Sequence, residues 1–295
     1  MIDLLLPTIS QGLLWSILAL GVYITFRVLD LADLTVEGSF PLGASVAVTL
    51  LVKDVNPVTA ILAAALAGGI SGVVTGLLHT KLKIPALLAG ILTMIALYSV
   101  NLRIMGKANI SLLGKETAFT ALESALGVAY SQAVVLLVGI LSCMVFSVLM
   151  YWFFGTEIGA AIRATGYNPQ MIRAQGVDTN VMLLIGLFFS NALVAVSGAL
   201  VAQSNGFADV GMGVGTIVIG LASVIIGEVL FGTRSFKNSL ISVILGSIVY
   251  RLVIAIVLQM GMPPNDLKLF TAVLVAIALS LPVVKGKFQS RKADL

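Results

Sequence analysis

Charged residues are scarce in this sequence of 295 residues. Lysine and arginine contribute 17 and aspartate and glutamate 13, which together make up 10% of the chain. Soluble domains carry about 25% charged residues, so these side chains are too few to cover a soluble protein of 30.8 kDa. The shortage of charge excludes an ordinary soluble enzyme, a secreted disulfide scaffold and a disordered chain.

Cysteine and histidine occur once each. Cys143 lies within an apolar run and has no second cysteine for an intrachain disulfide, and no cluster of Cys and His is present that would hold a metal ion. His79, close to Lys81 and Lys83, is interpreted as a loop residue rather than a base or a ligand. The sequence therefore predicts no metal site, no cofactor and no catalytic centre.

The sequence is rich in long hydrophobic runs. Hydrophobic residues make up 59% of the chain, and the mean hydropathy is +1.11. A helix needs about 20 apolar residues to cross a bilayer, and helices satisfy their own backbone in lipid. We therefore predict an all-α multi-pass membrane protein, with residues 1–295 as one transmembrane domain and about nine membrane segments. These segments are Leu4–Phe26, Gly38–Val52, Val55–Leu78, Ile84–Leu102, Ser124–Thr156, Thr179–Ala208, Val210–Gly227, Asn238–Asn265 and Leu269–Val284.

Basic residues on the predicted loops orient these segments. Loops 79–83, 155–180 and 232–237 and the tail from Lys285 carry lysine or arginine, and alternating spans place all four on one side. By the positive-inside rule this side is cytoplasmic. We therefore expect an inner-membrane protein with its N-terminus outside and its C-terminus in the cytoplasm. The same loops explain the net charge of +4 without a nucleic-acid partner.

The second segment differs from an ordinary span. Residues 34–52 read LTVEGSFPLGASVAVTLLV and contain Glu37, Gly38 and Pro41. Proline removes a helix hydrogen bond and glycine lowers the cost of irregular backbone, so we expect a broken or partly re-entrant helix. These three residues are candidates for the pathway or its gate. Because Glu37 follows Asp33, which is expected at the cytoplasmic side, it lies either at the interface or in an inner gate.

Four further polar residues are candidates for the pathway. Asn191, Gln203 and Asn205 lie in or at the end of the sixth run, and a polar group in a span needs a partner or a wet cavity. Arg251 interrupts the eighth run. It either attracts a substrate carboxylate or, as we favour, snorkels outward or forms an internal pair.

Other polar and aromatic residues near the ends of the runs are expected to be structural. Asn101 ends the fourth run and is expected to contact headgroups. Glu228, next to the cytoplasm, is expected to pair with Arg234. Trp15 is expected to anchor its span at the membrane interface.

Residues 155–180, between the fifth and sixth segments, are too short and polar to cross the membrane. Glu157–Thr165 is predicted to be a helix that Gly166 ends with a left-handed cap. Asn168 can cap a second helix and Pro169 suits its first position, and Gly176 can end it. The segment is therefore predicted to form a rigid helix–turn–helix knob.

Two interpretations of this knob remain open. Small residues such as Ala164 permit close docking of a partner, and Arg163 and Arg173 offer ion pairs at the rim. Alternatively, the segment is an amphipathic connector whose arginines contact lipid phosphates. We favour the docking knob, because a slack linker would suffice to connect two spans.

The run GAAIRATGYNPQMIRAQGV, residues 159–177, resembles the cytoplasmic coupling segment of ABC importer permeases of the branched-chain amino acid and ribose class. Met171 and Ile172 depart from the small residues often found there. Residues 12–44 and 217–246 are also similar to this family. The stretch LTVEGSF, with Asp33 before it, most resembles permeases assigned to tryptophan or tyrosine import. The positions that match the coupling pattern are Gly159, Ala161, Arg163, Ala164, Asn168, Pro169, Gly176 and Val177.

The resemblance implies a permease subunit that imports a small organic solute, such as an aromatic amino acid. Family members work as two permeases with two ATP-binding subunits, so a homodimer with its pathway on the two-fold axis is expected. An extracytoplasmic solute-binding protein would deliver the substrate. The sequence itself has no G-x-x-x-x-G-K-[ST] phosphate loop, so ATP hydrolysis is expected on a partner chain, and this chain is not expected to be an enzyme. The residues implied to couple to the ATPase are Arg163, Ala164, Gly166, Asn168, Pro169, Arg173 and Gly176.

The alternative is a self-contained secondary transporter or channel. A secondary transporter would transport its solute as the purified chain alone, driven by an ion gradient. Ionisable residues within the runs are sparse and form no clear proton relay, which favours the ATP-driven importer.

Overall fold

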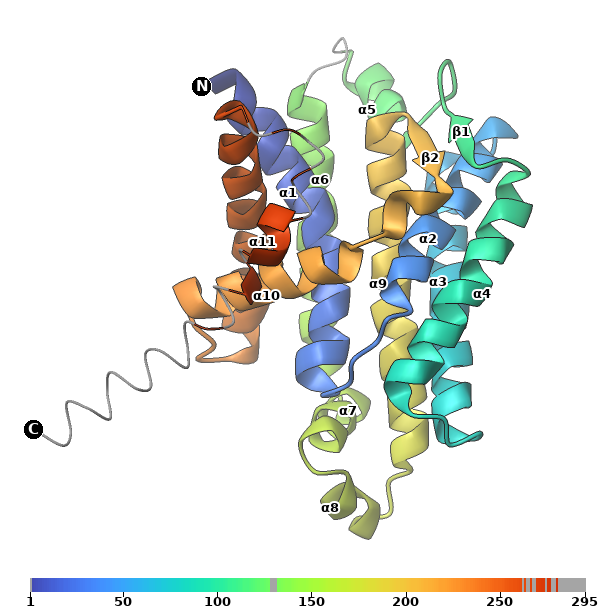
Figure 1. The fold of residues 1–295 in the computed structure, drawn as a ribbon, viewed down its shortest axis with the longest axis vertical. Helices are drawn as coiled ribbons and strands as arrows, with labels where there is room; N and C mark the ends of the chain where they lie inside the picture. Colours follow the sequence, from blue (N-terminus) through green and yellow to red (C-terminus); the bar gives the residue numbers. More distant parts are fainter. Residues whose placement is uncertain are drawn as a thin grey trace, which may run out of the picture.

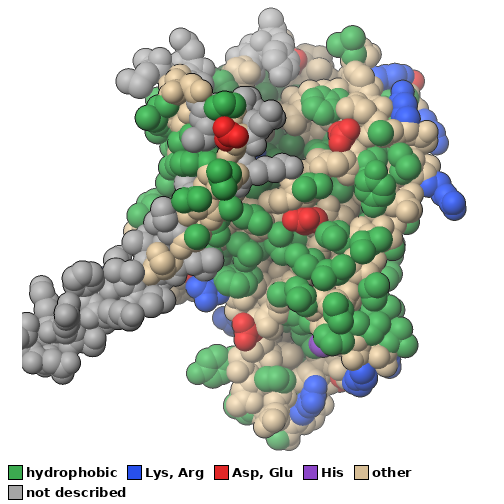
Figure 2. Space-filling model, in the orientation of Figure 1, with side chains coloured by type: hydrophobic (Ala, Val, Ile, Leu, Met, Phe, Trp, Pro, Cys, Tyr) green, Lys and Arg blue, Asp and Glu red, His purple; other side chains and the backbone are tan. Residues whose placement is uncertain are grey.

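The computed structural model describes residues 2–127 and 132–261, together with 263, 266, 269–273, 275–276 and 280. It is a bundle of helices, most of which run along the long axis of the molecule (Figure 1). Hydrophobic side chains are spread over the face of the bundle that Figure 2 shows, and within the described residues seven helical segments are long and apolar enough to span a membrane. They are α1 (Ile2–Tyr23) with its π-helical continuation η1 (Ile24–Val28), α3 (Pro57–Thr80), α4 (Ala86–Met105), α6 (Gln132–Gly155), α9 (Thr179–Asn205), α10 (Thr216–Phe231) with the preceding 3₁₀ turn η2 (Val210–Gly213), and α11 (Phe236–Gln259).

Shorter elements complete the described part of the chain. The helices are α2 (Val36–Val52), α5 (Ala118–Leu126), α7 (Glu157–Tyr167) and α8 (Pro169–Ala174), and the strands are β1 (Asn109–Ser111) and β2 (Phe207–Asp209). The strands pair antiparallel, with Ile110 opposite Ala208. This short ribbon is a departure from the all-α prediction, and it ties the segment after α4 to the end of α9.

Helices occupy the first eight predicted membrane segments. Half of the ninth predicted segment, Leu269–Val284, lies outside the described residues, and its described residues 269–273, 275–276 and 280 are helical. The basic tail from Lys285 is also outside them. The α3–α4 connection, the α7–α8 pair and the α10–α11 connection lie in the lower half of the bundle, whereas the N-terminus, α5 and the strands lie at the upper end (Figure 1). The three described basic loops therefore share one side, as predicted.

The predicted break within the second segment is wrong in its position. Helix α2 is continuous through Pro41. A proline there leaves the carbonyl of Glu37 without its usual amide partner, and Gly213 packs closely against that carbonyl. The irregular backbone precedes the helix instead. Residues 29–35 link η1 to α2 and rise to a point part-way along the bundle, where α2 begins (Figure 1).

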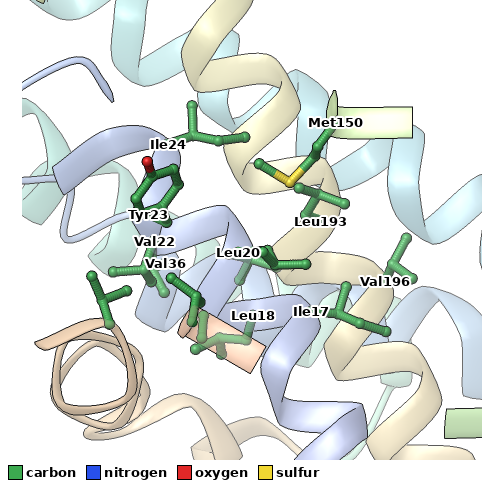
Figure 3. Packing of buried hydrophobic residues seen from close by; sticks show 14 of the residues in the cluster. Ile17, Leu18, Leu20, Val22, Tyr23, Ile24, Val36, Met150, Leu193 and Val196 are labelled. Carbon is green, nitrogen blue, oxygen red and sulfur yellow. The ribbon is translucent and has the colours of Figure 1, made fainter. Parts of the chain in front are cut away.

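Helix α1 forms the centre of the hydrophobic core. Ile17, Leu18 and Leu20 are fully buried. Figure 3 shows Ile17 and Leu20 on the side of Leu193 and Val196 of α9, whereas Leu18 packs against Gly220 of α10. These side chains contact neighbouring helices instead of lipid, and this packing holds the helices together.

Small residues bring α2, α3 and α9 into close contact. A Cβ on Gly43 would overlap the backbone of Ala195, and one on Gly198 would overlap the backbone of Phe40. On α3, a Cβ on Gly68 would meet α9 in the same way. Membrane helices rely on such small residues for close packing, because lipid supplies no hydrophobic driving force between them. These contacts fix α2 against α9, and so fix the polar groups that the two helices share.

Candidate functional site

The α7–α8 pair forms the predicted knob at the lower end of the bundle (Figure 1). The Asn168 side chain accepts a hydrogen bond from the Met171 amide, 3.1 Å away, and Pro169 is the first residue of α8. Gly176, which follows α8, has a φ of +86°, a conformation that glycine adopts readily. The restart at Asn168–Pro169 and the glycine stop are therefore present as predicted.

The predicted left-handed cap at Gly166 is wrong. Helix α7 continues through Gly166 to Tyr167, and Asn168 ends it by donating its amide to the Ala164 carbonyl at 2.9 Å. Gly166 serves a different purpose. A Cβ at this position would overlap the carbonyl of Val28, the last residue of η1. The glycine thus seats the knob directly on the end of the first membrane helix.

The two arginines of the knob are exposed and form no ion pair in the described part of the chain. The Arg163 guanidinium lies over the Phe236 ring, with 5.5 Å between its Cζ and the ring centroid. Arg173 donates from Nε to Thr179 Oγ1 at 2.7 Å. A guanidinium has five donors, so both side chains keep hydrogen-bonding capacity for a partner.

The linker 29–35 carries a carboxyl group into the bundle. Asp33, for which the sequence predicts a position near the cytoplasmic side, is 2% exposed. Its Oδ2 accepts from Asn191 Nδ2 of α9 at 2.8 Å, and its Oδ1 accepts from the Thr35 amide at 2.9 Å. Asn191 also donates to the Leu187 carbonyl and accepts from Ser39 Oγ at 2.7 Å. The linker is therefore held by hydrogen bonds to both α2 and α9.

Buried hydroxyl groups extend this network to α3 and α4. Thr35 is bonded to Thr75 at 2.7 Å, and Thr75 donates to Thr93 at 2.8 Å. Ser39 is bonded to Ser71 at 2.8 Å. Each of these hydroxyls is less than 5% exposed. Because unpaired polar groups are costly in an apolar environment, the network fixes four helices and the linker in one arrangement.

The three pathway candidates of α2, Glu37, Gly38 and Pro41, line a pocket of about 350 Å³ between α2, α4 and η2. Glu37 Oε1 accepts from the Gly215 amide at 3.0 Å. Asn101, expected at the headgroups, is fully buried and donates from Nδ2 to the Gly38 carbonyl at 3.3 Å. Pro41 packs against Gly213. The pocket thus lies where α2 begins and where η2 leads into α10.

The remaining pathway candidates are not brought together with this pocket. Gln203 is buried at the upper end of α9, where its Oε1 accepts from the Ala118 amide of α5 at 2.8 Å. Asn205 is exposed at the end of the same helix. The guanidinium of Arg251 lies over the ring of Trp15, with 4.1 Å between its Cζ and the ring centroid. Trp15 therefore packs inside the bundle instead of anchoring the span at the interface.

Comparison with known proteins defines the family. A family described as "Branched-chain amino acid transport system / permease component" matches residues 4–279. The chain belongs to this permease family. It is the permease component of an ABC-type transporter and a multi-pass membrane protein.

Two curated proteins are similar to the permease over most of its length. One is a tyrosine transport system permease protein of Clostridioides difficile (strain R20291), 41% identical over 276 residues, which are 94% of this chain and 90% of the relative. The other is an uncharacterized protein of Rickettsia prowazekii (strain Madrid E), 34% identical over 94% of this chain and 97% of the relative. Among solved structures, a metal-chelate type ABC transporter in an inward-facing conformation matches with a TM-score of 0.49 and 13% identity, covering 96% of this chain and 85% of that chain.

One ion pair of the permease was predicted with the wrong partner. Glu228 pairs with Arg27, not with Arg234, and Arg27 Nε lies 2.8 and 3.0 Å from the two carboxylate oxygens. The pair connects η1 to the end of α10. The signal for this pair in the sequence is that both side chains end apolar runs on the predicted cytoplasmic side, whereas Arg234 is only nearer to Glu228 in sequence.

Proposed function

We propose that the permease is the translocation subunit of an ATP-driven importer of an aromatic amino acid, and that tyrosine is the first substrate to test. Its 41% identity to a tyrosine transport system permease protein supports the substrate class. The proposed complex contains two permeases, two ATP-binding subunits that hydrolyse ATP, and an extracytoplasmic solute-binding protein. Residues 1–295 would form one domain in the inner membrane, with the N-terminus outside and the C-terminus in the cytoplasm.

The observation that carries this proposal is the seated knob. Tyr167 is 93% exposed and Met171 47% exposed, so both side chains of the knob are free to contact a partner. Gly166 seats the knob on Val28. A force applied to α7 by an ATP-binding subunit would therefore reach η1 and the linker that carries Asp33. This arrangement supports the docking interpretation over that of a lipid-facing connector.

The purified components test the proposed function directly. Vesicles that contain the permease, its ATP-binding subunit and internal ATP are expected to accumulate labelled L-tyrosine when the solute-binding protein is supplied outside. Vesicles with the permease alone and an imposed ion gradient are expected to accumulate none, because the hydrolysis that drives transport resides on the partner. Ion-driven uptake by the permease alone would instead support a secondary transporter.

Labelling of introduced cysteines tests the proposed orientation. Ser111 of β1 and Gln170 of α8 are both exposed, whereas the native Cys143 is buried. In intact cells a membrane-impermeant thiol reagent is expected to label Ser111→Cys but not Gln170→Cys, because the positive-inside rule places the knob in the cytoplasm. After permeabilisation both should react. The reverse pattern in intact cells would invert the topology.

A further inference from the structure

Two helices begin beside one another in the interior of the bundle. Helix α2 starts at Val36 and α10 at Thr216, and Figure 1 shows both starts part-way along its length. Glu37, in the first turn of α2, connects them through the 3.0 Å hydrogen bond from the Gly215 amide to Oε1. In membrane transporters, helix N-termini at this depth point at anionic groups, and here that group is the carboxylate of Glu37 itself.

The carboxylate of Glu37 lacks a cationic partner. The ion pairs in the described part of the chain are Arg27–Glu228 and Lys115–Asp54, and neither involves this residue. The Gly215 amide satisfies one oxygen, while Glu37 is half-buried and lines the 350 Å³ pocket. An acidic group within the membrane is costly, is rare, and is usually paired or part of a substrate or ion pathway. The missing partner therefore points to a ligand.

A second acceptor lies on the same pocket. Asn101 is 0% exposed, and its Nδ2 is used by the Gly38 carbonyl. Its Oδ1 has no hydrogen-bond partner among the described residues. Buried polar atoms are rarely left unpaired, so this oxygen also indicates a donor that binds from the pocket.

The remaining residues that line the pocket suit a small apolar group. Pro41, Met94, Ile95, Tyr98 and Val214 line the pocket. Ligand pockets range from about 300 to 1,000 Å³, so 350 Å³ lies at the end of that range suited to a single small molecule. The pocket thus combines two acceptors with an apolar and aromatic wall, and its described lining contains no basic side chain.

We propose that this pocket binds the ammonium group of the transported amino acid, with Glu37 as its counter-ion and Asn101 Oδ1 as a second acceptor. The assignment rests on the proposed function. An ammonium group has three donors and no acceptor, so two of its donors can bind the two acceptors on this wall. The aromatic side chain of the substrate would lie against Tyr98 and its apolar neighbours.

Glu37→Gln tests the charge without removing the contact to α10, because the amide oxygen of glutamine can still accept from Gly215. The complex should assemble, but the KM for L-tyrosine uptake should rise roughly tenfold or more, since a hydrogen bond to a charged group is lost. Asn101→Leu should raise KM in the same direction. Asp178→Asn is the matched control, because Asp178 also accepts a backbone amide, from Asn180 at 2.9 Å, at the start of α9 and outside this pocket. An equal KM in the wild type and Glu37→Gln would overturn the assignment.

A binding measurement separates this inference from the proposed function. Tyramine, which carries the aromatic ring and an ammonium group, should raise the unfolding temperature of the isolated wild-type permease. Neutral N-acetyltyramine should not, and Glu37→Gln should respond to neither. A Glu37-dependent response to tyramine without tyrosine uptake would contradict the proposed substrate and keep the site. A wild-type permease that tyramine does not stabilise, or equal stabilisation of Glu37→Gln, would overturn the site even if tyrosine is transported.

Discussion

Replacing Gly166 by valine is expected to abolish ATP-driven uptake while the permease still inserts into the membrane. A Cβ at this position overlaps the backbone of Val28 and Leu29, and backbone atoms cannot move aside as a flexible side chain can. Overpacking of this kind costs about 1–3 kcal/mol, and 1.4 kcal/mol is about a factor of ten. Helix α7 must therefore leave its seat, which removes the contact between the knob and η1.

Copurification of the ATP-binding subunit and ATP turnover in vesicles measure this effect. Turnover stimulated by the loaded solute-binding protein should fall roughly tenfold or more in Gly166→Val. Gly166→Ala should be similarly impaired, because the Cβ itself makes the clash. Gly155→Val is the matched control, since Gly155 is exposed at the end of α6 and a Cβ there meets nothing within 4 Å. Full attachment and turnover in Gly166→Val would show that its contact with Val28 does not position the knob.

The elements near Gly166 show what sequence alone can predict. The polar segment 155–180, the cap at Asn168 and the stop at Gly176 are local features, and the structure has all of them. The role of Gly166 is not local. Its neighbour Val28 lies far away in sequence, so the pattern that favours a left-handed cap was outweighed by a tertiary contact. Pro41 is a similar case, because α2 continues through it and the residue packed against it, Gly213, is distant in sequence.

For the candidate site residues, too, the sequence predicts local features but not distant contacts. Asn191 and Glu37 are unusual in the sequence because each is a polar residue in an apolar run. The cost of burying such a residue can be judged from sequence. Their partners could not be predicted from one chain. Asp33 is 158 positions from Asn191, and Gly215 is 178 positions from Glu37. Only the folded arrangement shows that Asn191 is fully hydrogen-bonded within a network while Glu37 faces a pocket.

Replacing Asn191 by leucine is expected to destabilise the permease strongly. Leucine has a similar volume but removes the donor to Asp33 Oδ2 and the acceptor for Ser39. Asp33 would keep the Thr35 amide but lose its other partner in a site that is 2% exposed. An unsatisfied buried polar group costs about 1–3 kcal/mol, and more if it is charged. We therefore expect a fall of several degrees in the unfolding temperature of the purified permease.

Asn205→Leu is the matched control for this change. It makes the same substitution on the same helix, but Asn205 is exposed at the end of α9, so its effect should be within about 0.5 kcal/mol. An equal fall in the unfolding temperature of both variants would mean that the effect of Asn191→Leu comes from the loss of a polar group in general and not from the loss of the network.

A reciprocal exchange tests whether the pair itself matters. Asp33→Asn alone turns one acceptor into a donor and leaves it facing the Asn191 amide or the Thr35 amide, so it should also destabilise. In the double variant Asp33→Asn/Asn191→Asp, the new amide can donate to the new carboxylate, which can still accept from Ser39. The Leu187 carbonyl alone loses its side-chain donor. The double variant should therefore be more stable than either single variant, which is a coupling that independent sites do not show. If the stability losses of the two single variants simply add in the double variant, a specific bond between the linker and α9 is excluded. A displaced knob and linker would then have no such bond through which to move α9.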